Sequence, residues 1–244
     1  MNTPSHLEAS SDGSTTADSI VLAAGLILER EGLDALSTRT IASAAGVPAP
    51  TIFRLFGDKQ GLLEAVAWLG FRTYLQQKIE LLALDDPVEV LRRAWDLHVD
   101  FGLSHPAYYR LVFDHSPPGA ASEAGGAAIA ALQAMVANVA KAGRLRMSVE
   151  RATLYMHANG VGTVLTLLSL PQARRDMQLA TVTRDAVMQT ITTDAPRKGG
   201  KAAASIRNQA GALRELLQRE TPPSLTNGER TLLDEWLKRL SDAP

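Results

Sequence analysis

The sequence predicts an all-α fold in which a small N-terminal group of three helices precedes a larger bundle of helices. Apolar residues recur at three- and four-residue spacing along almost the whole chain, as at Ile20, Ala24, Ile27 and Leu28, and this is the period of one helical face. Alternating β-branched residues, which mark half-buried strands, are nearly absent. Breaks rich in proline and glycine, such as residues 116–126, divide the pattern into lengths typical of helices.

The chain divides into four regions by composition. Residues 1–17 are polar, lack the apolar segment of a signal peptide, and are expected to form a disordered leader. Residues 18–65 are expected to form the small domain and residues 66–194 the larger one. Residues 195–244 combine a basic linker with a C-terminal helical extension. Helices are expected over residues 88–103, 106–113, 149–170, 172–193 and 225–240, besides others that end near residues 84 and 143.

Residues 37–59 carry the signals of two short helices joined by a tight turn. Ser37 is a good N-cap, because its hydroxyl accepts from an amide of the first turn. Gly46 supplies the left-handed residue that ends a helix, and Pro48 prevents that helix from continuing. Pro50 suits the first turn of a second helix, which Gly57 closes. Two helices joined in this way form a helix-turn-helix, whose second helix enters the major groove of DNA. The alternative is an ordinary helical hairpin, which needs no polar face.

The pattern extends over the first seventy residues. The amphipathic helix and the stretch EGLDALSTRTIASAAGVPAPTIFRLFGDKQGLLEAV (residues 31–66) resemble the DNA-binding domain of the TetR family of bacterial transcriptional regulators. The resemblance implies three helices, a fourth that follows them, and a larger helical domain for ligand binding and dimerisation. It also implies a sequence-specific regulator that binds double-stranded DNA, specifically a repressor released by a small molecule.

The resemblance also assigns residues to the DNA interface. They are Thr38, Arg39, Ala49, Pro50, Thr51, Phe53, Arg54 and Lys59. Arg39 takes a base-reading position, where its guanidinium can form two hydrogen bonds with guanine. Thr38 and Lys59 take phosphate-contacting positions, and Arg54 is expected to add a backbone contact; the alternative for Arg54 is a solvated surface charge. The family usually has tyrosine where this chain has Phe53, which lacks the hydroxyl that would bind a phosphate.

The charge of this region is unusual for a DNA-binding domain. Residues 1–70 contain four basic and eight acidic side chains, a net charge of −4, whereas such domains are usually basic. Between residues 37 and 59, however, the chain has three basic side chains and only one acidic side chain. Because phosphate contacts dominate affinity, we expect weak non-specific binding and a shallow salt dependence. Specific binding then requires a homodimer, with an inverted repeat as operator.

The larger domain is expected to hold an unknown small-molecule effector. Candidate lining residues combine apolar bulk with a few polar groups, namely Trp95, His98, Phe101, Tyr109, Phe113, Met135, Met156, His157 and Asn159. The alternative is that most of them are simply core residues. In the family, the last two helices of this domain form an interface between two copies. The candidates for that interface are Met156, Gly160, Val164, Leu168, Val182 and Val187, and the alternative is that the nearly apolar stretch 153–170 is a buried core helix.

Other classes of function find little support in the sequence. The chain has no phosphate-binding glycine loop and none of the common catalytic motifs, so we expect neither an enzyme nor a cofactor. His98, His105, His115 and His157 lack the spacing of a metal site. The absence of cysteine suits a bacterial cytoplasm, and no run approaches the length of about eighteen apolar residues that crosses a membrane. The rival reading is a non-enzymatic helical adaptor that binds proteins and not DNA.

Overall fold

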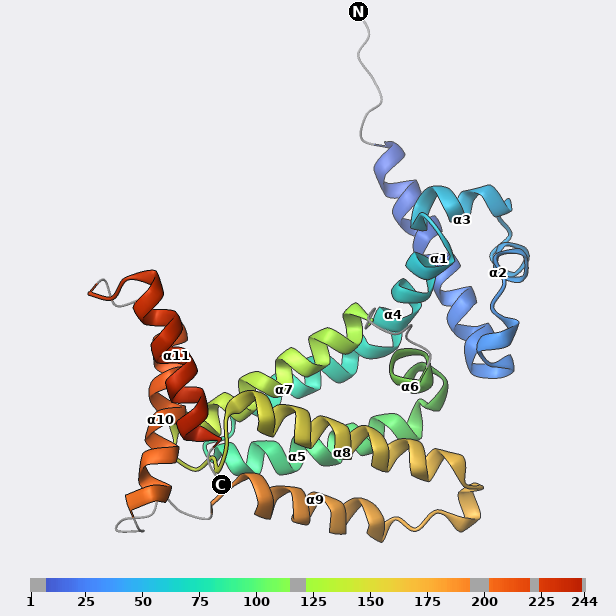
Figure 1. Cartoon of the computed structure of the whole chain (residues 1–244). Helices are drawn as coiled ribbons and strands as arrows, with labels where there is room; N and C mark the ends of the chain where they lie inside the picture. The colour runs from blue at the N-terminus through green and yellow to red at the C-terminus, as the bar shows by residue number, and fades with distance from the viewer. Residues whose placement is uncertain (1–7, 115–121, 194–201, 220–223, 243–244) are drawn as a thin grey trace, which may run out of the picture. The chain divides into compact units, whose positions relative to one another are not determined.

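The computed structural model describes residues 8–114, 122–193, 202–219 and 224–242. Within these ranges the chain is helical and contains no strand, which confirms the all-α prediction. The α-helices are α1 (Glu8–Glu31), α2 (Thr38–Ala44), α3 (Ala49–Phe56), α4 (Lys59–Glu80), α5 (Pro87–Ser104), α6 (Pro106–Phe113), α7 (Glu123–Lys141), α8 (Val149–Ser169), α9 (Gln178–Ile191), α10 (Ala202–Arg219) and α11 (Asn227–Ser241) (Figure 1). Short 3-10 turns cover Leu33–Ala35, Leu81–Ala83 and Gln172–Arg174.

The first helix is longer than its sequence pattern indicates. Helix α1 begins at Glu8, inside the stretch expected to be a disordered leader; residues 1–7 lie outside the described part of the chain. The buried stripe of Ile20, Ala24 and Leu28 holds the helix in place. A helix propagates from a stable segment by adding one residue at a time, so it can extend into a polar stretch that has no apolar pattern of its own.

The helices group into two compact units, which are described separately. Unit 1 comprises residues 1–75 and 104–126, and unit 2 comprises residues 76–103 and 127–244. The division within α4 therefore lies ten residues later than the expected boundary after residue 65. The reason is aromatic packing, because Phe71 on α4 makes edge contacts with Tyr74 and with Phe113 on α6, each at 5.7 Å between ring centroids.

Unit 1 has a continuous apolar core beneath the first four helices. Its fully buried members include Ile20, Leu28, Leu36, Ile41, Ile52, Leu62, Val66 and Phe71. Tyr108 on α6 fits closely against α1 and α4, where it meets two glycines. A Cβ on Gly70 would lie 2.4 Å from a carbon of the Tyr108 ring, and a Cβ on Gly25 would lie 2.5 Å from its hydroxyl oxygen. Glycine at these positions therefore allows the ring to pack directly on the helix backbones.

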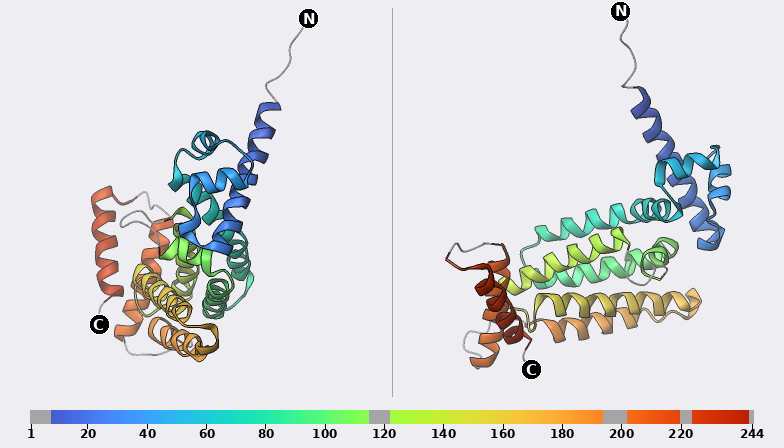
Figure 2. Two further views of the ribbon diagram at one scale, coloured as in Figure 1. Left: turned by 90° about the vertical axis from the view of Figure 1, so that its right-hand side faces the viewer. Right: turned by 45° about the horizontal axis from the view of Figure 1, so that its top comes forward.

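Unit 2 is a helical bundle in which α8 and α9 run side by side (Figures 1 and 2). Its buried members include Leu91, Trp95, Met135, Val136, Met156, Val164, Leu167, Met188 and Ile191. The indole nitrogen of Trp95 on α5 donates to the carbonyl oxygen of Ala180 on α9 at 3.1 Å. Helix α9 begins at Gln178, later than the expected residue 172, and a 3-10 turn covers Gln172–Arg174 instead. The backbone amide of Gln178 donates to the carboxylate of Asp176 at 3.0 Å.

The C-terminal extension forms a hairpin of two helices, α10 and α11 (Figure 1). A capping box starts α11, because Thr226 and Glu229 exchange side-chain and backbone hydrogen bonds. Helix α10 was not predicted, and residues 194–201 of the expected linker lie outside the described residues. Arg214 fastens the hairpin to the bundle, since its guanidinium bonds Glu150 on α8 at 2.5 Å and Asp234 on α11 at 2.8 Å.

Candidate DNA-binding site

The turn between α2 and α3 has the geometry that its residues predict. Ser37 caps α2 by accepting a hydrogen bond from the amide of Thr40 at 3.0 Å. Helix α2 ends at Ala44, and Gly46 follows with a φ of 66°, which favours glycine. Pro50 lies in the first turn of α3, and Gly57 ends that helix with a φ of 77°. The structure thus contains a helix-turn-helix, as predicted.

The two helices bury one face and expose the other. Ile41, Ala42 and Ile52 are buried against the rest of unit 1. All eight residues expected at the DNA lie on α2, on α3 or at the first residue of α4, and none is buried. Arg39, Pro50, Phe53, Arg54 and Lys59 are exposed, and Thr38, Ala49 and Thr51 are half-buried. Backbone geometry therefore leaves the predicted polar set available to an external partner.

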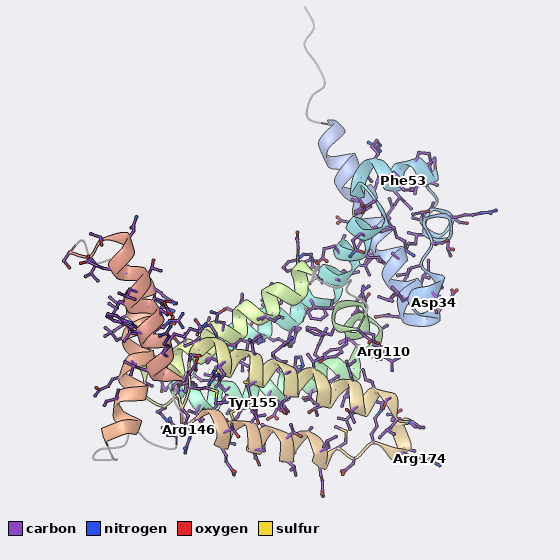
Figure 3. All side chains as sticks on the ribbon, viewed as in Figure 1. Asp34, Phe53, Arg110, Arg146, Tyr155 and Arg174 are labelled. Carbon is purple, nitrogen blue, oxygen red and sulfur yellow. The ribbon has the colours of Figure 1, made fainter. Side chains whose placement is uncertain are left out.

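Phe53 is the most unusual member of this set. Its side chain is 49% exposed, and Figure 3 shows it on α3. A phenyl ring in this position is not needed for the core, because Ile52 already fills the buried side of α3. An exposed aromatic ring on a recognition helix can make apolar contact with a thymine methyl group or a sugar.

The start of α4 adds a second polar element to this surface. Asp58 caps the helix, because its carboxylate accepts from the amide of Gly61 at 2.8 Å. A Cβ on Gly61 would lie 2.1 Å from the carbonyl oxygen of Phe56, so glycine lets α4 begin directly after α3. Lys59, the first residue of α4, is exposed beside the free amides of this helix start, and such amides favour a phosphate.

The predicted effector residues do not all belong to the same unit. Tyr109 and Phe113 lie in unit 1. The other candidates lie in unit 2, namely Trp95, His98, Phe101, Met135, Met156, His157 and Asn159. Tyr109 and Phe113 are packed against each other, with ring centroids 4.8 Å apart, and burial raises the pKa of Tyr109. Asn159 donates its amide to the carbonyl of Tyr155 at 2.7 Å. Met135 lines a cavity of about 300 Å³ with residues of the α4–α5 connection and of α7.

One polar residue of unit 2 escaped the sequence prediction. Lys78 is buried on α4, and its amine donates to the carbonyl oxygen of Ala128 on α7 at 2.9 Å. The apolar neighbour of Lys78, Ile79, is exposed instead. The usual preference of lysine for solvent conceals such a position, because no local signal distinguishes a buried lysine from an exposed one.

The structure corrects the expected dimer face of α8 and α9. Val182 is exposed as expected, whereas the other five candidates are buried inside the chain itself, namely Met156, Gly160, Val164, Leu168 and Val187. The opposite side of α8 presents Leu154, Tyr155, Ala158 and Gly162 to solvent. The helix is apolar on nearly all sides, so its sequence alone does not separate the side that packs inward from the side that remains outside.

Two further properties concern metals and membranes. Among the described residues no three His, Asp or Glu side chains come together as a metal site, and His115 lies outside those residues. Helix α7 has the length and composition of a membrane span, with a mean hydropathy of 1.2 over its apolar window. Half of that window is buried inside the protein, as is usual for a core helix of a bundle.

The helix pair, its buried apolar side and its exposed polar side define a helix-turn-helix protein of the DNA-binding class. Residues 15–66 match the sequence pattern of the family described as "Bacterial regulatory proteins, tetR family". The N-terminal domain therefore matches the TetR family of transcriptional regulators, which confirms the resemblance noted in the sequence. No curated protein sequence is similar enough to the chain to count as a relative.

Solved structures share the fold of the larger part of the chain. A protein of unknown function from Rhodococcus sp. RHA1 is 26% identical, with a TM-score of 0.57, over 73% of this chain and 96% of that one. RolR in complex with its ligand resorcinol is 18% identical, with a TM-score of 0.58, over 87% and 97%. A TetR family transcription regulator from Marinobacter aquaeolei VT8 is 19% identical, with a TM-score of 0.55, over 76% and 99%.

Proposed function

We propose that the protein is a cytoplasmic, homodimeric repressor that binds a specific double-stranded DNA operator and releases it when a small molecule binds. One observation carries the proposal. Arg39, Arg54 and Lys59 are exposed around the turn of a helix-turn-helix, while Ile41 and Ile52 fix the other face of the same two helices in the core. A rigid helix pair that presents cations outward is suited to the DNA backbone and to base edges in the major groove.

Base recognition is assigned to α3 and to one residue of α2. Arg39 can read guanine through two parallel hydrogen bonds to its O6 and N7 atoms. Pro50 and Thr51 open α3 and offer apolar groups, which suit a thymine methyl. Phe53 extends this apolar surface along the helix. The operator half-site is therefore expected to combine a guanine with one or more thymines.

Few cations are available for the phosphates. Arg54 and Lys59 provide two per subunit, or four in a dimer. Each neutralised phosphate contributes about −0.9 to the slope of log affinity against log salt, so a slope of about −4 is expected. Because unit 1 as a whole carries many acidic side chains, non-specific DNA should be bound weakly, and specificity should come from two half-sites read together.

The surface that pairs two copies is assigned to the outer sides of α8 and α9. Leu154, Ala158 and Gly162 are exposed at four-residue spacing on α8, and Val182 and Ala186 are exposed in the same way on α9. Leu154 and Val182 are 62% and 65% exposed. Ridges of this spacing with small residues allow helices of two copies to pack closely.

A charged substitution on the ridge tests the pairing. Ala158→Arg should give a monomer by sedimentation equilibrium, because the guanidinium would be buried between the two copies. Ala130→Arg is the matched control, since Ala130 is exposed on α7 and the same change there should leave the mass of the assembly unchanged. A dimeric Ala158→Arg variant would show that another surface joins the subunits.

The effector is assigned to unit 2, which supplies the apolar bundle that such a ligand needs. RolR, a structural neighbour of this chain, is in complex with its ligand resorcinol, and this supports a small-molecule effector for this chain. A ligand weakens operator binding only if it binds more tightly to the conformation in which the two recognition helices no longer match successive major grooves of the DNA. A coupling of about 1–3 kcal/mol corresponds to a roughly 5- to 150-fold loss of DNA affinity.

The test is selection of bound duplexes from a random double-stranded DNA library by the purified, ligand-free protein. We expect enrichment of an inverted repeat. Arg39→Ala should lose about 1–3 kcal/mol of discrimination at one guanine of each half-site. Arg30→Ala is the control, because Arg30 is exposed at the end of α1 and lies outside the helix pair.

The rival function is a protein-binding adaptor, and the net charge of −4 over residues 1–70 is the observation that favours it. The adaptor would select no DNA sequence while remaining folded and dimeric, and Arg39→Ala would leave its behaviour unchanged. That result would replace the repressor as the proposed function.

A further inference from the structure

The C-terminal hairpin of α10 and α11 (Figure 1) contains a cleft of about 500 Å³. Residues of both helices line it, together with Leu225 just before α11. This volume lies within the range of about 300–1,000 Å³ that is typical of small-molecule sites. All the described residues that line the cleft belong to the C-terminal extension, so the cleft is separate from the bundle residues to which the effector is assigned.

The apolar part of the lining is aliphatic. It consists of four leucines, namely Leu217, Leu225, Leu233 and Leu237. Leu237 is buried, whereas the other three are only half-buried. No aromatic side chain is among the described residues that line the cleft, so the lining offers a flat ring no stacking partner. An aliphatic chain that covered the half-buried leucines would remove apolar surface from water, which is favourable.

The polar part of the lining contains a guanidinium group with an unused donor. Arg230 on α11 is half-buried, and one of its terminal nitrogens donates to the side chain of Asn227. Its Nε is shielded from solvent and has no hydrogen-bond partner within the described part of the chain. A buried donor that lacks an acceptor is unfavourable, and more so when it is charged. A carboxylate would supply the missing acceptor, because its two oxygens match the spacing of guanidinium donors.

The carboxylates of α11 nearest to Arg230 in the sequence are engaged elsewhere. Asp234 lies one turn further along the helix, but it accepts from Arg214 at 2.8 and 3.1 Å and from Gln218 at 3.2 Å. Glu229 is held in the capping box at the start of the same helix. Arg230 therefore keeps its charge and its Nε donor for a group that enters the cleft.

We propose that the cleft of the C-terminal hairpin is a binding site for a small aliphatic carboxylic acid. The carboxylate accepts hydrogen bonds from the guanidinium of Arg230, and the chain of the acid packs along Leu217, Leu233 and Leu237. Because these residues come from both helices, the bound acid holds α10 and α11 together. The site goes beyond the proposed repressor function and does not depend on it, since it uses neither the helix-turn-helix nor the bundle.

The test uses three probes that separate the charge from the chain. Octanoate carries both, octanamide carries only the chain, and acetate carries only the charge. Each is added to the full-length protein at neutral pH without DNA, and hydrogen exchange is followed. Octanoate at ten times its Kd should slow the exchange of amides in α10 and α11 roughly tenfold, because it binds only the closed hairpin. Octanamide and acetate at the same concentration should have little effect.

Substitutions in the cleft locate the site. Arg230→Met should weaken octanoate binding roughly 10- to 100-fold in isothermal titration calorimetry, as expected for loss of a hydrogen bond to a charged group, and Arg230→Lys should keep part of the affinity. Leu225→Trp fills the cleft but leaves Arg230 in place, and it should also weaken binding. Arg239→Met is the matched control, because Arg239 pairs with Glu235 on the exposed side of the same helix, and it should bind octanoate like the wild type.

Two results would overturn the proposal. One is protection of α10 and α11 by octanamide that equals the protection by octanoate, since the charge would then play no part. The other is undiminished octanoate binding in both Arg230→Met and Leu225→Trp, which would place the acid outside the cleft. Selection of an operator uses ligand-free protein, so failure of the hairpin site would leave that result intact. Failure to select an operator would in turn leave octanoate binding measurable.

Discussion

Replacing Arg214 by methionine should loosen the C-terminal hairpin without unfolding the bundle. Arg214 is 9% exposed, and its guanidinium joins three helices. Its Nε and one terminal nitrogen donate to the carboxylate of Asp234 at 2.8 and 3.1 Å, and the other terminal nitrogen donates to Glu150 at 2.5 Å. Its hydrogen bonds to Asp234 also hold the pKa of that carboxyl below its usual value. The substitution keeps the aliphatic length and removes all these bonds.

The size of the effect follows from the exposure of the two carboxylates. Breaking a fully buried ion pair costs about 3–5 kcal/mol, since it leaves a charge without a partner. The side chains of Glu150 and Asp234 are 34% and 42% exposed, so water can solvate the carboxylates that remain. We therefore expect a loss of about 1–3 kcal/mol, confined to the contact between the hairpin and α8.

Native-state hydrogen exchange is the assay that resolves such a local loss. Amides of α10 and α11 should exchange roughly 5- to 150-fold faster in Arg214→Met, whereas amides in the middle of α8 should be unaffected. Arg239→Met is the control, because Arg239 pairs with Glu235 on the exposed side of the same hairpin, where ion pairs contribute less than about 1 kcal/mol. Equal exchange in Arg214→Met, Arg239→Met and wild type would refute the reasoning.

Three further predictions concern stability. Gly70→Ala should destabilise the protein by about 1–3 kcal/mol in urea, despite the better helix propensity of alanine, because the new Cβ would lie 2.4 Å from the Tyr108 ring; a neutral or stabilising effect would mean that the ring is free to move. Ser37→Ala should lose about 1 kcal/mol by thermal denaturation, since it removes the cap on the Thr40 amide, and an unchanged melting temperature would contradict this. Burial lowers the pKa of Lys78 from 10.5 to about 8, so its unfavourable contribution is complete below pH 8 and fades as the pH rises toward 10.5. The free energy of unfolding of the wild type should accordingly rise by up to about 3 kcal/mol relative to that of Lys78→Met between pH 7.5 and pH 10. A constant difference between the two proteins would exclude a lowered pKa of Lys78.

The helix-turn-helix was predictable because its determinants are local. These determinants are helix caps and left-handed glycines, and each acts on residues no more than four positions away; they are Ser37, Gly46, Gly57 and Asp58. Such a residue can be recognised without knowing what packs nearby. The same holds for the capping box at Thr226. Each of these features has the geometry in the structure that the sequence indicated.

The features that were missed depend on neighbours distant in sequence. The outward side of α8 is set by which helices pack on its other side, and an all-round apolar helix gives no period from which to read this. Lys78 is buried while its apolar neighbour Ile79 is exposed, and the carbonyl that accepts from Lys78 lies fifty residues later in the chain. The start of α1 at Glu8 likewise depends on the stability of the helix that follows, and not on its own polar residues.

The three tryptophans of the chain lie in three different surroundings, and this makes them built-in reporters. Trp68 on α4 belongs to unit 1 and is partly exposed, Trp95 is buried in the bundle with its indole nitrogen bonded to Ala180, and Trp236 on the hairpin is half exposed. Indole emission shifts to longer wavelength as the ring meets water. Replacing two of the three with phenylalanine would leave one fluorophore for one part of the molecule, so that operator binding, effector binding and hairpin opening can each be followed optically without attaching a dye.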